Sequence, residues 1–562
     1  ISYIGYQSLT YPLNGRSEIT IELREDLQSL DEVVVVGYGT VRKRDLTGAV
    51  ASVKGDKLKE TASFSTTEAL QGRAAGVNVM RTNATPGGSS SVRIRGNRSL
   101  KATNEPLYVV DGIPIVVGLN EMSPSDIESI EILKDASATA IYGSRGANGV
   151  ILITTKKGRS SKTQIDYNGY YGIQQATRTI DMMNGAEWVE LVREANRATT
   201  RTTPYPLVPT LEWDRRIGYF TADPNVISKI EMGYDENGNW HPERVPYTDW
   251  MDETLRLAPI QNHEISVRGG SDNIKMLASA TYFNQDGVVK GQDYSRYSIR
   301  VNFDWVLNDR VTIGGNTQFS HFDRNAGNNL YHDVRGIYPL ADIYDENGNY
   351  ITERPGNDPQ LWNQFLNLDH RKREQKKDRF VGSYYLEAKL PLDITFRSNV
   401  GLDTGPYYDN EFYGALSSDR SGSPARAINR TDTRRMYTWE NLLFYNKQLN
   451  PDNHIGLTFL QSIQEETQET NEIRVRELPY ENQLWYNVGS AQDIESVGSN
   501  YIRWRLASFM GRINYNYKDK YLLTMSARYD GSSRLAPDHK WVLFPSVALA
   551  WRINEESFLK EA

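Results

Sequence analysis

Strict alternation of apolar and polar residues, which begins near residue 161, is the feature that most constrains the fold of this chain. Between residues 294 and 306, for example, Tyr297, Ile299 and Trp305 share one face of an extended chain, and polar residues share the other. A period of two predicts β-strands. We find about twelve such segments of roughly ten residues, the length that a tilted strand needs to cross a membrane. They lie near 164–175, 261–268, 273–285, 294–306, 310–324, 378–390, 393–403, 433–448, 453–466, 502–517, 519–530 and 541–553.

The connections between these segments alternate in length. The tight turns lie at 269–272, 308–309, 391–392, 450–453 and 518–519. The other connections are mostly long and lie at 176–260, 286–293, 325–377, 404–430, 467–501 and 531–540. Short turns at one rim and long loops at the other are typical of an outer-membrane barrel. The pattern therefore predicts a membrane β-barrel of antiparallel strands, with a soluble β-protein of many strands as the alternative.

The two faces of the predicted strands differ in the way that a membrane barrel requires. Its apolar residues face lipid and its polar residues line the lumen. Val301 lies mid-strand on the apolar face, so Val301→Arg is expected to cost about 2–4 kcal/mol near the bilayer midplane. Asn302→Arg, on the lumen face, is expected to be tolerated.

Composition excludes several classes of protein. The net charge of -7 argues against a binder of nucleic-acid phosphates. The absence of Cys removes disulfides, thiolate metal sites and Cys nucleophiles. No apolar run is long enough for a transmembrane helix. The seven His are scattered, and neither a zincin pair nor a Ser nucleophile elbow is present. We therefore expect no enzymatic activity, no cofactor and no metal site.

Three regions precede the alternating segments. Residues 1–25 alternate in polarity and are predicted to be the last hairpin of a small β-domain. Residues 26–44 form a linker that contains four consecutive valines. Residues 45–158 combine a short capped helix with several strands, so they are predicted to form a compact α+β domain.

Five blocks of this region, in order, resemble the SusC/RagA family of TonB-dependent receptors from outer membranes of Bacteroidetes-type bacteria. They are Ala69-Leu-Gln-Gly-Arg-Ala-Ala-Gly-Val77, Val92-Arg-Ile-Arg-Gly96, Tyr108-Val-Val-Asp-Gly-Ile-Pro114, Asp126-Ile-Glu-Ser-Ile-Glu-Ile-Leu-Lys-Asp135 and Ala140-Ile-Tyr-Gly-Ser-Arg-Gly-Ala-Asn-Gly149. The linker is similar to the TonB box of the family. Under this resemblance the box comprises Asp31, Glu32, Val33, Val34, Val35, Val36, Gly37, Tyr38 and Gly39.

The resemblance also implies an organisation for the chain. Residues 1–25 would end a carboxypeptidase-regulatory-like domain, and residues 45–158 would be a plug domain in the barrel lumen. The family barrel is expected to have about 22 strands, which is wide enough to hold a plug. Since about twelve strands are found, residues 161–562 are expected to be the N-terminal part of the barrel, with the C-terminal part missing.

The function that the resemblance implies is active import of a nutrient across the outer membrane. The energy would come from an inner-membrane TonB–ExbB–ExbD complex that binds the box by β-augmentation. A surface lipoprotein of the SusD type would lid the barrel, and the cargo would be an oligosaccharide or an oligopeptide. Surrounding lipid is the remaining expected partner, and no nucleic acid is expected. The alternatives are a passive porin and a soluble glycan-binding β-protein.

Candidate ligand residues are few. The resemblance places the plug segment that contains Arg81 and Asn83 toward the ligand side. Five Trp residues fall in predicted outer loops, where they form either loop cores or stacking platforms for a ligand. Of these we select Trp362 as a candidate contact.

Overall fold

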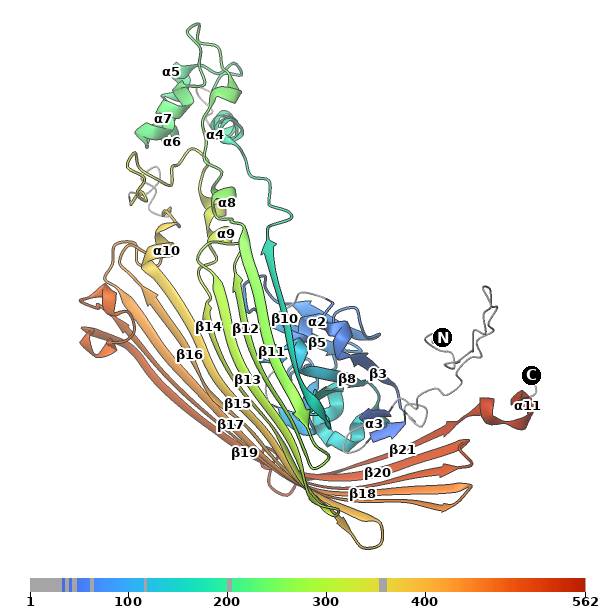
Figure 1. Ribbon diagram of the computed structural model, residues 1–562. Helices are drawn as coiled ribbons and strands as arrows, with labels where there is room; N and C mark the ends of the chain where they lie inside the picture. The colour runs from blue at the N-terminus through green and yellow to red at the C-terminus, as the bar shows by residue number, and fades with distance from the viewer. Residues whose placement is uncertain are drawn as a thin grey trace, which may run out of the picture.

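The computed structural model describes residues 33–35, 40–42, 48–60, 65–115, 119–199, 205–352 and 361–560. A small domain lies against the concave face of one large curved sheet, and short helices gather beyond one end of that sheet (Figure 1). Two short strands, β1 (Val33–Val35) and β2 (Thr40–Arg42), precede the small domain. The β-domain predicted over residues 1–25 lies outside the described residues.

The large sheet contains twelve antiparallel strands in sequence order. They are β10 (Ser161–Gln174), β11 (Ala258–Gly270), β12 (Ile274–Asp286), β13 (Asp293–Asn308), β14 (Val311–Asn325), β15 (Arg371–Leu390), β16 (Ile394–Tyr413), β17 (Arg426–Asn450), β18 (Asn453–Arg476), β19 (Asp493–Tyr517), β20 (Tyr521–Ser532) and β21 (Trp541–Trp551). Each predicted segment corresponds to one strand. Within the described part of the chain β10 and β21 do not pair with each other, so the sheet is open and these two strands are its edges.

The polarity of the sheet is inverted relative to a soluble barrel. On β13, Tyr297 and Ile299 are 53% and 58% exposed on the convex face, whereas Arg300 on the concave face is 1% exposed. The same alternation holds on the neighbouring strands because side chains of a strand point to opposite faces in turn. The apolar face is therefore the outer one, as predicted for a strand that meets lipid.

Five strands extend further toward the long-loop end than the alternation predicts. β15 to β19 contain 20 to 25 residues each. Residues 371–377, 404–413 and 467–476, which the alternation predicts to be loops, are continuous strand. The assignment was wrong because beyond a membrane both faces of a strand meet water, so the apolar face that produces a period of two disappears.

The small domain is built on a five-stranded sheet in the order β3-β8-β9-β6-β7, with a separate hairpin of β4 and β5. Its elements are β3 (Val50–Lys54), α1 (Gly55–Leu58), α2 (Thr66–Ala69), β4 (Val77–Arg81), β5 (Ser90–Ile94), β6 (Leu107–Val110), β7 (Ile113–Ile115), η2 (Leu119–Glu121), η3 (Pro124–Asp126), β8 (Ile127–Leu133), α3 (Ala136–Thr139), η4 (Ala140–Asn148) and β9 (Val150–Thr155). Its apolar core includes Leu70, Val92, Ile130 and Ile151, all fully buried.

The helices form a second packed unit at the long-loop end. They come from the connections 175–257 and 326–370, which share one apolar cluster that includes Trp188, Phe220 and Phe365. Its helices are α4 (Gly185–Thr199), α5 (Leu211–Asp214), α6 (Gly218–Thr221), α7 (Pro224–Glu231), η5 (Pro242–Arg244), α8 (Trp250–Glu253), α9 (Leu330–Asp333), η6 (Val334–Gly336) and α10 (Leu366–His370). Shorter turns follow at η8 (Glu481–Gln483), η9 (Val488–Ser490), η10 (Ile553–Glu555) and α11 (Ser557–Lys560). Every helix of the described residues is too short or too polar to span a lipid bilayer.

Candidate functional site

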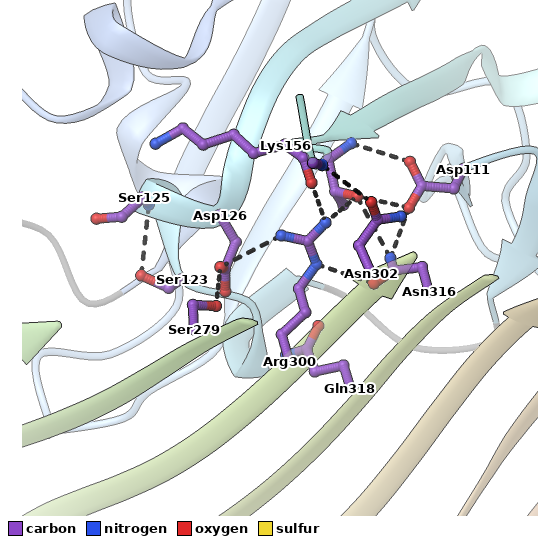
Figure 2. Close-up of polar contacts among 12 residues, drawn as sticks. Asp111, Ser123, Ser125, Asp126, Lys156, Ser279, Arg300, Asn302, Asn316 and Gln318 are labelled. Atoms are coloured by element: carbon purple, nitrogen blue, oxygen red, sulfur yellow. Dashed lines mark hydrogen bonds and ion pairs between the residues drawn. The ribbon is translucent and has the colours of Figure 1, made fainter. Parts of the chain in front are cut away.

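The strongest concentration of buried charge lies where the small domain meets the concave face of the sheet. Arg300 of β13 is at the centre of one such contact (Figure 2). Its guanidinium lies 3.5 Å from the Asp126 carboxylate and donates to the backbone oxygen of Lys156 at 2.5 Å. Ser279 of β12 donates to the same carboxylate at 2.7 Å. A single wall arginine therefore joins two segments of the small domain.

The network continues through Asn316 of β14. Its side-chain nitrogen donates to Asp111 Oδ2 at 2.6 Å, and its oxygen accepts from Arg300 Nε at 3.0 Å. The Thr155 hydroxyl, from β9 of the small domain, donates to the same Asp111 Oδ2 at 2.6 Å. Asp111 occupies a turn with positive φ, of 47°, which is followed by Gly112 at 89°. This tight turn between β6 and β7 presents the carboxylate to the wall.

A second buried contact is centred on Glu121 of η2. Lys377 Nζ and Arg379 Nη1 of β15 each lie 2.7 Å from its carboxylate oxygens. Arg379 also makes a two-point contact with Asp403 of β16, at 2.9 and 2.7 Å. Burial alone would raise the pKa of Glu121, but the two neighbouring cations outweigh burial and hold this pKa at about 2. Glu121 is therefore ionised at neutral pH while the small domain is seated.

A third contact fixes the glycine-rich segment η4. Arg528 of β20, which is fully buried, donates to the backbone oxygen of Ile141 at 2.5 Å and pairs with Asp530 at 2.7 Å. Gly143 has φ of 60°, and a Cβ at this position would lie 1.9 Å from Asp530 Oδ2. Only glycine satisfies both requirements, because other residues rarely adopt this backbone and would collide with the carboxylate.

At Asn302 the concave face has no room for the additional charge that the sequence analysis expected it to accept. Asn302 is 3% exposed, and its side-chain oxygen accepts from the Gly158 N–H at 3.2 Å. An arginine here would displace the small domain or leave a buried charge unpaired, at a cost of several kcal/mol. The expectation that Asn302→Arg is tolerated is wrong because the lumen is filled by protein at this depth.

The predicted TonB box is only partly described. Val33–Val35 pairs antiparallel with Thr40–Arg42, with Val34 opposite Val41. Asp31, Glu32, Val36, Gly37, Tyr38 and Gly39 lie outside the described residues. The pair forms a sheet of its own, so each of its strands has one edge not used in this pairing. A strand edge of this kind is compatible with β-augmentation by another protein.

The plug residues selected as ligand contacts are both exposed and belong to the β4–β5 hairpin, Arg81 to its first strand and Asn83 to its connecting loop. Arg81 ends β4 and lies 3.2 Å from Glu68. Asn83 accepts from the Thr85 hydroxyl at 2.6 Å, and Thr85 in turn accepts a hydrogen bond from Arg324 of the wall. Both residues are accessible, and their contact with a ligand stays a prediction.

Trp362 occupies a different environment. It is 8% exposed, and its indole N–H donates to the backbone oxygen of Leu416 at 2.9 Å. This leaves little of its ring for a stacked ligand. The other four Trp residues of the outer loops belong to, or pack against, apolar clusters of the loops, which favours the loop-core interpretation. They are Trp213, Trp240, Trp250 and Trp485.

Sequence reasoning missed the wall residues that hold the small domain. They come from five different strands and share only a polar residue type on the concave face. They are Ser279, Arg300, Asn316, Lys377, Arg379 and Arg528. Among the residues that the structure describes, no group of three or more His, Asp or Glu is arranged to hold a metal ion.

Comparison with known proteins identifies the small domain. Residues 42–150 match the TonB-dependent receptor plug domain. The chain is 34% identical over 578 residues to TonB-dependent receptor P26 of Formosa agariphila and 30% identical over 622 residues to TonB-dependent receptor SusC of Bacteroides thetaiotaomicron. Both matches include all of this chain. The chain spans about half the length of each relative, 54%.

The fold is also similar to solved structures. A solved structure of the RagAB peptide importer in its closed-closed state superposes on this chain with a TM-score of 0.77 at 24% sequence identity. The superposition covers 92% of this chain and 58% of the importer chain. The plug, the inverted sheet and these relatives place the chain in the SusC-like family of TonB-dependent receptors.

Proposed function

We propose that this protein imports a nutrient across the outer membrane, with energy delivered by a TonB–ExbB–ExbD complex to the segment around Val33–Val35. The observation that carries the proposal is the plug domain seated on the polar, concave face of a membrane-type sheet by buried ion pairs at Glu121 and Asp126 and by a buried hydrogen bond from Arg528. A plug held by several charged contacts needs work to move, and TonB would supply that work. A passive porin has no use for such a domain.

The outer apolar face supports a location in the outer membrane, crossed by many strands. Exposed apolar residues on one face of every strand would aggregate in a soluble β-protein. The long-loop end would then lie outside the cell and the tight turns would lie in the periplasm. The relatives are named as receptors and importers, and we infer that no chemistry is done on the cargo. Since the chain spans about half of its relatives' length, closure of the barrel would require further strands between β21 and β10.

We infer that a SusD-like lipoprotein covers the long-loop end and that the cargo is an oligopeptide or an oligosaccharide. The packed loop unit supports a lid partner, because its two connections are far longer than simple links between strands. The RagAB structure is described as a peptide importer, and its similarity to this chain supports the fold. Affinity purification in detergent is expected to recover a second, lipidated chain at similar abundance.

Uptake measurements test the proposal. Cells that express the receptor are offered single labelled oligopeptides and oligosaccharides, with and without a protonophore. We expect accumulation of one class of cargo, and we expect its loss when the proton gradient collapses or when TonB is deleted. Accumulation that survives both treatments would favour a passive channel and contradict the proposal.

A further inference from the structure

The upper part of β19 has an uncovered edge. β19 pairs with β18 along its length, from Asp493 to Tyr517, but it pairs with β20 only from Leu506 onward. Ser533 adds two contacts with the Arg505 backbone, since its N–H donates to the Arg505 oxygen at 3.0 Å and its hydroxyl accepts from the Arg505 N–H at 2.9 Å. Within the described residues no strand lies against the other side of residues 493–504. At about 3.4 Å per residue this edge is about 40 Å long.

The edge offers both backbone groups and apolar surface. In an antiparallel sheet alternate residues direct their N–H and C=O groups to opposite sides, so about half of these groups in residues 493–504 face the open side. Residues 495–503 are exposed on both faces of the strand. Val497 and Tyr501 are 70% and 58% exposed. An added strand would satisfy the backbone groups and cover these side chains.

The central part of this edge lacks the usual protections of an edge strand, although the register of β19 shifts at one end, between Ile494 and Ser496. Natural edges are blunted by Lys, by Pro, or by being very short. Residues 493–504 contain neither Lys nor Pro, and the central residues 496–502 carry no charge. A long, uncharged edge of this kind templates the addition of another strand.

The charged residues at the two ends of the edge determine which charges a partner strand needs in order to pair with it. Glu495 and Arg503 lie four residues on either side of Ser499. Both remain partly exposed, although Glu495 pairs with Arg426 at 2.7 Å and Arg503 pairs with Glu465 at 2.9 Å. Opposite charges that face each other across strands are favourable, and like charges are unfavourable.

We propose that residues 493–504 bind an extended polypeptide as an added antiparallel strand, with a basic residue of the partner opposite Glu495 and an acidic residue opposite Arg503. The backbone groups would supply affinity, and the two charges would set the direction and register. The inference goes beyond import and depends on the proposed function only for placing this edge outside the cell.

A second copy of the chain is not the occupant, although its own edge has the required charges. Two copies upright in one membrane are related by a rotation about the membrane normal. Strands tilted by about 35–45° would then cross at roughly twice that angle, rather than run antiparallel. The occupant that we propose is an extended segment of a different polypeptide at the cell surface; if a further segment of the same protein covered the edge instead, the parent peptide described below would not bind.

The self-complementary charges provide a probe. A labelled synthetic peptide that copies residues 493–503 is free of the membrane constraint and places its own Arg503 opposite Glu495 of the receptor. We expect saturable binding to the purified receptor in detergent, followed by fluorescence anisotropy. The doubly charge-reversed receptor, Glu495→Arg with Arg503→Glu, is expected to bind this peptide about tenfold more weakly. A peptide with the same two reversals is expected to restore binding.

Backbone methylation tests the strand geometry itself. One peptide is N-methylated at the positions of Val497, Ser499 and Tyr501, and the other at 496, 498 and 500. Because alternate N–H groups point to the partner strand, one peptide is expected to lose binding and the other to keep it. Equal behaviour of the two peptides, failure of the charge reversal to restore binding, or no binding of the parent peptide would overturn the proposal. None of these measurements requires TonB or transport, so their failure is distinct from failure of the proposed function.

Discussion

Glu121→Ala tests the idea that buried ion pairs seat the plug. The substitution removes the plug carboxylate that faces Lys377 and Arg379 at 2.7 Å. Breaking a buried pair from one side costs about 3–5 kcal/mol, because the remaining charge is left uncompensated. Arg379 keeps its two-point contact with Asp403, so we take the lower end, about 3 kcal/mol.

Hydrogen exchange of plug amides measures this effect. At about 1.4 kcal/mol per tenfold change, the plug is expected to open about 100-fold more often in Glu121→Ala. Amides of β8 and β9 that exchange through release of the plug would then exchange faster by this factor. Detergent-solubilised receptor is the sample, and mass spectrometry of plug peptides is the readout.

Glu60→Ala is the matched control. Glu60 is a plug carboxylate with two cations beside it, Lys57 at 2.8 Å and Arg73 at 3.1 Å, but its side chain is 53% exposed. Exposed pairs contribute about 0–1 kcal/mol, so plug exchange should change little. Equal exchange in the two variants would refute the claim that the buried contact seats the plug.

The same contact predicts a pH dependence. The pKa of Glu121 falls from an ordinary 4.5 to about 2 when the plug is seated, since the two cations outweigh burial. Its contribution to seating is therefore fully present above about pH 4.5 and is lost as the pH falls toward 2. Over this range plug release in the wild type is expected to approach that of Glu121→Gln, which has no such titration. Parallel pH profiles of the two proteins would contradict this assignment.

Three further substitutions probe other parts of the structure. Gly143→Ala places a Cβ 1.9 Å from Asp530 Oδ2 and should loosen the plug by about 1–3 kcal/mol in the same exchange assay, whereas Gly72→Ala, also at positive φ but with no atom within 4 Å, should affect it less. Val301→Arg should reduce the yield of assembled, heat-modifiable receptor by costing about 2–4 kcal/mol, and Val301→Thr should assemble normally; equal yields would reverse the assignment of the lipid face. Arg193→Leu leaves a fully buried carboxylate without its cation, at about 3–5 kcal/mol, so limited proteolysis should cut the loop unit while the sheet stays intact.

Much of the sheet could be predicted from the sequence because the membrane imposes the alternation. The segment predicted at 294–306 is strand β13 at Asp293–Asn308. The extensions above the membrane could not be predicted in this way. Residues 371–377 read Arg-Lys-Arg-Glu-Gln-Lys-Lys, which has no apolar face. They form a strand because β16 pairs with all of them and β14 pairs with residues 374–377.

The contacts that seat the plug were beyond sequence reasoning for a different reason. Glu121 and Lys377 are 256 residues apart, and neither has neighbours that mark it as a partner. Their pairing depends on the depth and rotation of the plug in the lumen, which the local sequence does not encode. The loop unit poses the same difficulty, since Trp188 and Phe365 belong to one cluster formed by two distant connections.

Uptake in Val34 variants tests the central claim of TonB-driven import most directly. Val34→Pro removes one backbone donor and fixes φ, which strand addition at this position should not tolerate. Val34→Ile keeps the donor and the preference for a strand. We predict that Val34→Pro abolishes uptake while receptor level and cargo affinity stay at wild-type values, and that Val34→Ile changes little. Uptake by Val34→Pro at the wild-type rate would contradict the account.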